Sequence, residues 1–160
     1  MSDFAQSWKL SRSRFLAALE GMNHEQLNWR MHEGTLTMAE MAMHVAGVEV
    51  SFASQLTGRE LSPEEARIKA AATDGVVNDK PFPYSSAEMT PEFVAASLAK
   101  AEAIAGPVIE AADPEVRTRE IVSALGPVIT GDGAFARLGF HAGYHQGQAH
   151  FIQTAPGFPK

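Results

Sequence analysis

Two histidines near the C-terminal end of the sequence, His141 and His145, stand four residues apart. Positions i and i+4 of an α-helix lie one above the other on the same face, so both imidazoles of such a pair can reach one metal ion. Apolar residues recur around them at helical spacing, which places both histidines on the side that faces the core. The pair therefore predicts part of a metal site, and the remaining ligand must come from another segment.

A third histidine, His44, lies on the edge of the apolar stripe of an earlier predicted helix. Three neutral imidazoles leave an open position on a four-coordinate metal ion, where water or substrate can bind. A divalent ion lowers the pKa of a bound water or thiol, which gives a nucleophile near neutral pH. Since no fourth ligand is evident, His44, His141 and His145 predict a reactive centre rather than a closed structural one. A hydrogen-bonded core histidine is the alternative interpretation of His44.

Four segments with helical periodicity must position these histidines. The first ends near Gly21, and the second begins at a capping box, Thr37 to Glu40, and runs to about Thr57. The four segments are 4–20, 37–57, the residues from Thr90 onward, and 130–154. The pattern predicts an all-α fold, a four-helix bundle with a long crossover segment between its second and third main helices.

The connections are less regular. Residues 22–34 read as a loop or short turn, and a second capping box predicts a short helix over 63–72. Residues 74–86 form a long connection, and Gly106-Pro107 is expected to kink or end the third main helix. Residues 115–129 fit neither helical nor strand periodicity, and no convincing strand pair is found.

Composition limits the classes of function. A chain of 160 residues is long enough for a sizeable core, and we expect one domain over residues 1–160. There is no cysteine, so disulfides and thiolate ligands are excluded, which fits a cytoplasmic location. A formal charge of −6 without a block of Lys or Arg argues against nucleic acid as a partner. No secretion signal and no apolar run of membrane-spanning length are found, so we expect no membrane association.

Two stretches carry a resemblance to a known family. The run GTLTMAEMAMHV, residues 34–45, resembles the second-helix segment of the DinB/YfiT-like family of four-helix-bundle proteins. The run HAGYHQGQ, residues 141–148, is similar to that family's H-x-x-x-H-x-G-Q signature. The resemblance covers roughly residues 4–154 in order and spacing, and the two stretches together are more specific than either alone.

The resemblance implies that His44, His141 and His145 fall on the family's metal-ligand triad. It further implies one divalent metal ion (zinc or nickel), frequent homodimers and a cytoplasmic location. Some members of the family are transferases or isomerases that use low-molecular-weight thiols such as bacillithiol or mycothiol. We therefore expect a small-molecule substrate and a thiol cosubstrate.

Three functions remain open at this point. The first is a metalloenzyme that activates a thiol for attack on an electrophile. The second is metal-dependent hydrolysis, although no carboxylate base is evident on either histidine face. The third is a stress-related binding module without catalysis, whose metal is structural or vestigial.

Several further residues have two interpretations each. Glu40 lies one turn before His44 and either orients its ring or only closes the capping box. Gln148 either reaches a histidine or lies on the surface. His150 is about 140° around the helix from His145 and is not expected to bind the metal.

The crossover segment 58–89 offers Phe82 and Tyr84 to a second copy of the chain. His24 and His32 lie in the predicted loop, where a second metal site is the alternative to two ordinary loop histidines.

Overall fold

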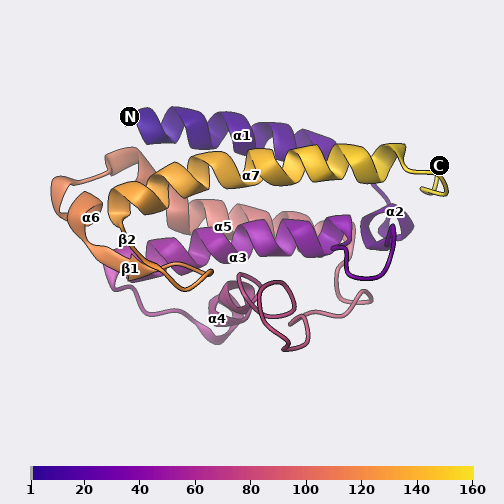
Figure 1. The fold of residues 1–160 in the computed structure, drawn as a ribbon, viewed down its shortest axis with the longest axis horizontal. Coiled ribbons are helices and arrows are strands. Elements are labelled where there is room, and N and C mark those ends of the chain that lie inside the picture. The colour runs from indigo at the N-terminus through magenta and orange to yellow at the C-terminus, as the bar shows by residue number, and fades with distance from the viewer. Residues whose placement is uncertain (1) are drawn as a thin grey trace.

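The computed structural model describes residues 2–160, and the fold is mostly helical (Figure 1). Four long helices lie side by side: α1 (Asp3–Leu19), α3 (Met38–Thr57), α5 (Pro91–Ala111) and α7 (Gly131–Thr154). α1 packs along α7, α3 packs along α5, and α7 also contacts α3. The shorter elements are α2 (His24–Asn28), α4 (Pro63–Ala70), α6 (Pro114–Thr118), β1 (Glu120–Val122) and β2 (Val128–Thr130). The prediction of a mostly helical fold is confirmed.

Both predicted capping boxes fix the starts of their helices. The Thr37 hydroxyl accepts from the Glu40 amide at 3.1 Å, and the Glu40 carboxylate accepts from the Thr37 amide at 2.8 Å. The same reciprocal pair of bonds joins Ser62 and Glu65 at the start of α4. α3 ends at Gly58, whose φ of 70° is the left-handed conformation that glycine adopts readily.

α3 is the central element of the core, and nearly all of its residues are buried. A buried polar network ties it to its neighbours. The Glu49 carboxylate accepts from the Trp8 indole at 2.8 Å and from the Arg12 Nε at 3.0 Å. Arg12 also donates to the Leu98 carbonyl of α5 at 2.6 Å. Burial raises the pKa of the Glu49 carboxyl, and the positive charge of Arg12 opposes that shift. One side-chain cluster thus joins α1, α3 and α5.

The third main helix does not end at Gly106-Pro107, which corrects part of the sequence-based expectation. α5 continues to Ala111 with Pro107 inside it. Proline removes one backbone hydrogen bond and its ring crowds the carbonyl four residues earlier, at a cost of about 3 kcal/mol. Buried Ile104, Ala105 and Ile109 on both sides of Pro107 pack into the core, and this tertiary packing outweighs that local cost.

The region that showed no clear periodicity contains a β-hairpin, so the expectation of no strand pair is wrong. β1 pairs with β2 in antiparallel register, with Ile121 opposite Ile129. The Gln55 side chain of α3 donates to the Val122 carbonyl at 3.1 Å and accepts from the Val122 amide at 3.0 Å. Each strand has three residues, too few for a period of two to show in the sequence.

The aromatic residues of the crossover segment, Phe82 and Tyr84, pack against their own chain. Tyr84 is buried, packs against Phe93 in a tilted arrangement with 5.3 Å between ring centroids, and lies under the Arg67 guanidinium. Phe82 is partly buried against the core. These two residues therefore do not form the exposed surface that the sequence suggested for a second copy. Within residues 2–160, none of the helices combines the length and hydropathy that crossing a bilayer requires.

Candidate metal centre

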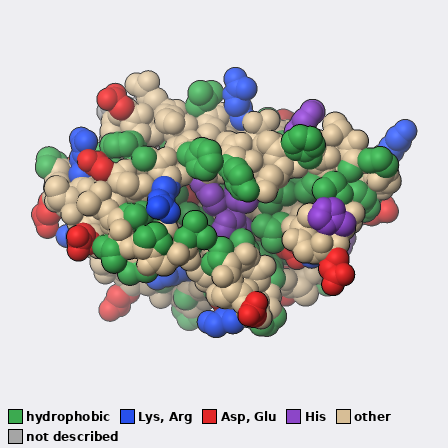
Figure 2. All heavy atoms as spheres, viewed as in Figure 1, with side chains coloured by type: hydrophobic (Ala, Val, Ile, Leu, Met, Phe, Trp, Pro, Cys, Tyr) green, Lys and Arg blue, Asp and Glu red, His purple; other side chains and the backbone are tan. Residues whose placement is uncertain are grey.

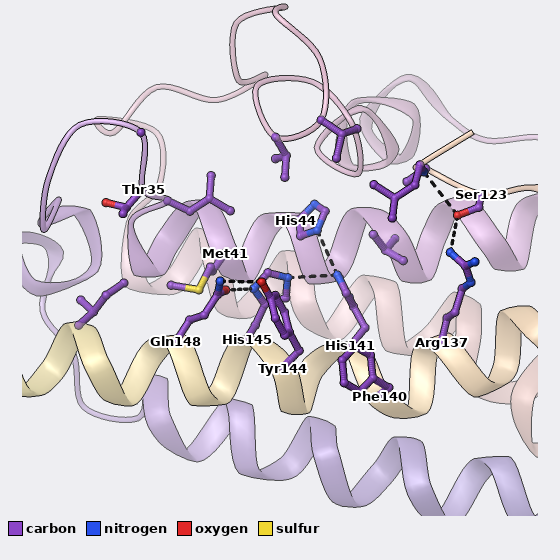
Figure 3. A pocket seen from close by; sticks show the side chains of 18 of the residues that line it. Thr35, Met41, His44, Ser123, Arg137, Phe140, His141, Tyr144, His145 and Gln148 are labelled. Carbon is purple, nitrogen blue, oxygen red and sulfur yellow. Dashed lines mark hydrogen bonds between the residues drawn. The ribbon is translucent and has the colours of Figure 1, made fainter. Parts of the chain in front are cut away.

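α3 and α7 bring the three predicted histidines to one point (Figure 3). The Nε2 atom of His141 lies 3.1 Å from that of His44 and 3.1 Å from that of His145. One ligand atom from each ring lies within 4.8 Å of the others. Two of the residues are one helical turn apart on α7, and the third faces them from α3. The structure thus places together all three residues that the sequence singled out.

Two of the rings are held in one orientation by bonds to their other nitrogen. The His44 Nδ1 lies 3.0 Å from the carbonyl oxygen of Ala71, which can only accept. The His145 Nδ1 lies 2.7 Å from the Gln148 side-chain oxygen, and the Gln148 amide in turn donates to the Tyr144 hydroxyl at 3.1 Å. Both histidines therefore carry their proton on Nδ1 and direct an unprotonated Nε2 toward His141.

This arrangement of lone pairs fits a cation. The Nε2 of His141 faces two unprotonated nitrogens at 3.1 Å and can donate a proton to only one of them. At least one contact therefore sets two lone pairs against each other, which a shared metal ion relieves. In a tetrahedral zinc site with bonds of about 2.0–2.1 Å, neighbouring nitrogens are roughly 3.3 Å apart. The imidazole set suits zinc or nickel among the divalent ions.

Burial keeps the three imidazoles in the neutral form that binds metals. It lowers the pKa of His44, and the bond to the Ala71 carbonyl opposes the shift. It lowers the pKa of His145 to about 4, with the nearby charge of His44 as the second cause. It lowers the pKa of His141 well below the ordinary value, and the other two histidines add to the effect. All three lone pairs are therefore available at neutral pH.

The histidines lie in the wall of a cavity of about 730 Å³. Figure 2 shows histidine side chains at the bottom of a hollow in the middle of this face, with hydrophobic side chains around it. The apolar walls include Met41, Val48 and Phe52 of α3 and Phe140 and Tyr144 of α7. Within the described part of the chain, no Asp or Glu lines the cavity. The site can thus hold an apolar ligand beside the three imidazoles and offers no carboxylate as a base.

The structure decides between the two interpretations of Glu40 and between those of Gln148. The Glu40 carboxylate bonds to the Thr37 amide and to Arg30, at 2.6 Å, rather than to His44. Its role is therefore the capping box. Gln148 does reach a histidine, through the bond to the His145 Nδ1.

The remaining histidines lie elsewhere. His150 is exposed on α7, as its angle on the helix predicted. His24 bonds to the Ser86 carbonyl at 2.9 Å, and His32 bonds to the Glu33 carbonyl at 2.8 Å. Across residues 2–160, the group of His44, His141 and His145 is the one that meets the geometry of a metal site.

Sequence reasoning missed two features of the site. The Ala71 carbonyl that orients His44 is a backbone group, so no pattern of side chains in the sequence predicts it. Arg137 lines the cavity and precedes His141 by four residues, which is the same spacing that singled out the histidine pair. That spacing was the signal by which it could have been found.

Comparisons with known proteins identify the family and the fold. The family model described as DinB superfamily matches residues 7–149. The fold is similar to the crystal structure of a conserved protein from Enterococcus faecalis, with a TM-score of 0.68 and 16% sequence identity over 94% of this chain and 92% of that chain. At that identity the similarity concerns the fold alone. A search of curated proteins found no match.

Proposed function

The chain belongs to the DinB superfamily, and on that premise we propose that it is a metal-dependent enzyme that activates a low-molecular-weight thiol. The thiol would lose its proton to solvent, and its sulfur would form a bond to the electrophilic carbon of a small molecule. The leaving group would depart with the electrons of its bond, so the reaction class is S-transfer. The observation that carries this proposal is the convergence of three imidazole nitrogens in the wall of an apolar cavity.

The side chains of the site have separate tasks in this proposal. His44, His141 and His145 would hold one zinc or nickel ion through Nε2. Such an ion lowers the pKa of a thiol or water, which supplies a nucleophile near neutral pH. Ala71 and Gln148 keep two of the rings in the protonation state and orientation that ligation needs.

The cavity supports sulfur chemistry over hydrolysis. Hydrolysis needs a base within hydrogen-bond reach of the attacking water, and no Asp or Glu of residues 2–160 lines the cavity. The chain has no cysteine, so the sulfur has to come from a cosubstrate. The mainly apolar walls favour an electrophile with an apolar body. Metal-dependent hydrolysis and a non-catalytic metal-binding module are the two alternatives.

We also propose the finer structural assignments that the family suggests. Residues 1–160 would form a single domain, a four-helix bundle of the DinB/YfiT type with the crossover segment between α3 and α5. The protein would act in the cytoplasm as a homodimer on a small-molecule substrate, with neither nucleic acid nor a membrane as a partner.

A conjugation assay tests the proposed reaction. The protein, loaded with zinc or nickel, is mixed with bacillithiol, mycothiol, glutathione or cysteine and a set of model electrophiles, with and without chelator. We expect turnover that needs both metal and thiol and that is lost in His44→Ala, His141→Ala and His145→Ala. The matched control is His150→Ala, which removes an exposed histidine of the same helix and should retain full turnover.

Each alternative gives a different result in the same assay. Turnover that proceeds equally well without thiol indicates hydrolysis. Turnover that survives loss of the three histidines removes the metal from the reaction. No turnover with any pair of substrates favours the binding module.

A further inference from the structure

Arg137 combines two features that no other arginine shares: within residues 2–160 it has no carboxylate partner, and it lines the cavity of the three histidines. The sequence contains eight arginines, and six of them form ion pairs with Asp or Glu. Of the other two, Arg14 is exposed on α1, whereas Arg137 is half-buried and lines the cavity of the three histidines. A half-buried guanidinium without a counter-charge within residues 2–160 has donors available for an anionic ligand in the cavity.

The guanidinium of Arg137 is held in place rather than free to turn into solvent. Its Nη1 donates to the Ser123 hydroxyl at 2.9 Å, and Ser123 is buried (Figure 3). Ser123 lies in the turn between β1 and β2, where its amide bonds to the Pro127 carbonyl at 3.0 Å. The hairpin itself is fixed to α3 through Gln55. The remaining N–H groups of Arg137 have no acceptor in the described part of the chain.

Arg137 is placed relative to His141 by the same spacing of four residues that relates His141 to His145. It lies four residues before His141, so the two side chains leave the same face of α7 about 6 Å apart along the axis. Figure 3 shows Arg137 and His141 on the same side of α7, each joined to a group on the opposite wall. A small molecule can therefore contact both at once.

The charge of the cavity points to an anion. The whole chain carries a formal charge of −6, yet Arg137 is the one formally charged side chain among the residues that line this cavity. The guanidinium offers a planar fork of donors, and this fork matches a carboxylate through two parallel hydrogen bonds. The other walls are mainly apolar and suit the body of the same ligand.

We propose that Arg137 is the substrate-recognition residue of this cavity and binds the carboxylate of a small molecule whose apolar body lies along α7 toward the three histidines. The proposal deepens the proposed function, because it names the class of substrate that reaches the centre. The carboxylate belongs either to the thiol or to the electrophile, and the experiment below distinguishes these sources.

Calorimetric titration of chelator-treated protein at pH 7.5 tests the proposal without turnover. The ligand pairs are 3-phenylpropionate with 3-phenylpropionamide, and 3-mercaptopropionate with 2-mercaptoethanol. In each pair one member carries a carboxylate and the other is neutral. We expect wild-type protein to bind the carboxylate of at least one pair about tenfold or more tightly than its neutral partner, as a charge-assisted fork predicts.

Variants assign that preference to one side chain. Arg137→Gln should abolish the preference and leave binding of the neutral ligands unchanged. Arg137→Lys, which keeps the charge but loses the fork, should retain part of the preference and also serves if the glutamine variant does not fold. The matched control is Arg14→Gln, which makes the same change of charge on the surface of α1 and should keep the full preference.

The outcomes of the titration test carboxylate binding by Arg137 separately from the proposed S-transfer reaction. A preference confined to 3-mercaptopropionate assigns the carboxylate to the thiol, and a preference for 3-phenylpropionate assigns it to the other substrate. Equal binding of charged and neutral ligands by wild-type protein, or a preference that persists in Arg137→Gln, overturns the proposal. Because the titration uses metal-free protein and measures no turnover, it tests the role of Arg137 independently of the proposed S-transfer reaction.

Discussion

The geometry of the centre depends on His141, because its ring contacts both of the other histidines. It stands between His44 and His145, 3.1 Å from each, and unlike them it has no bond from Nδ1 to a neighbouring group of residues 2–160. Its orientation is therefore set by the two rings that it faces. Three neutral ligands would leave the full charge of a divalent ion uncompensated, so a metal bound here would favour an anionic fourth ligand such as a thiolate.

The lowered histidine pKa values predict an acid-sensitive metal-free protein. His145 in the folded protein has a pKa of about 4, below the ordinary value of 6.5 that it regains on unfolding. As the pH falls from 6.5 toward 4, the unfolded chain takes up a proton before the folded one does, so unfolding becomes more favourable. The His145 contribution is fully present above pH 6.5 and is lost by pH 4, a change of about 3 kcal/mol in the free energy of unfolding.

Urea denaturation in the presence of chelator, repeated between pH 7.5 and 4, measures this contribution. The variant His145→Gln removes the titrating ring while Gln148 remains. Its free energy of unfolding should fall less over this pH range than that of wild-type protein. Parallel curves for the two proteins would show that His145 is not held neutral by the fold.

At the scale of elements, a close approach between α3 and α4 orients His44. Gly47 lies one turn after His44, and a Cβ atom there would come within 2.6 Å of the Ala72 amide nitrogen and 2.7 Å of the Ile68 carbonyl oxygen. Only glycine lets the end of α4 approach α3 this closely. The contact brings the Ala71 carbonyl to the His44 Nδ1. The glycine thus determines where one ligand points.

The substitution Gly47→Ala should therefore weaken metal binding from outside the centre. The added methyl group pushes the end of α4 away and removes the acceptor from His44, so we expect metal affinity to fall on the order of tenfold. Overpacking should also lower the free energy of unfolding by about 1–3 kcal/mol. Competition with a chromogenic chelator and urea denaturation give the two values.

The matched control is Gly147→Ala on α7, where a Cβ atom would meet no other atom within 4 Å. It should leave metal affinity unchanged and raise the free energy of unfolding by about 0.5–1 kcal/mol, because alanine favours a helix over glycine. Wild-type affinity in Gly47→Ala would argue against the role given to α4.

The elements that local patterns specify were predictable, and the contacts between distant segments were not. Capping boxes at Thr37 and Ser62 fixed two helix starts, and the i,i+4 pair with His44 identified the three residues that converge. The hairpin was missed because Gln55, 67 residues before Val122, holds it in place. Of the two expectations for Gly106-Pro107, a kink or an end, the end is wrong, because tertiary packing holds α5 together on both sides of Pro107.

At the scale of the whole molecule, the three most exposed large apolar side chains of residues 2–160 lie at the cavity. Leu125, Phe140 and Phe151 line the cavity, yet they are 71%, 65% and 71% exposed. Single exposed apolar residues are ordinary, but several of them beside one cavity are typical of a binding surface. This surface takes the place of Phe82 and Tyr84, which the fold buries or partly buries.

We predict that the protein is a homodimer in solution. A second copy would cover part of this apolar surface and so remove it from water. Light scattering at micromolar concentration should give twice the chain mass of 17.2 kDa. The double variant Phe140→Ser/Phe151→Ser should shift the mass toward that of one chain if the surface forms the interface. A wild-type mass of one chain would contradict the prediction.

The central claim, that His44, His141 and His145 bind one divalent ion together, is tested most directly by the metal content of the purified protein. Elemental mass spectrometry should find about one zinc or nickel ion per chain in wild-type protein and in the control His150→Ala. The triple variant His44→Ala/His141→Ala/His145→Ala should contain almost none while its circular dichroism remains helical. Full metal content in the folded triple variant would contradict the claim.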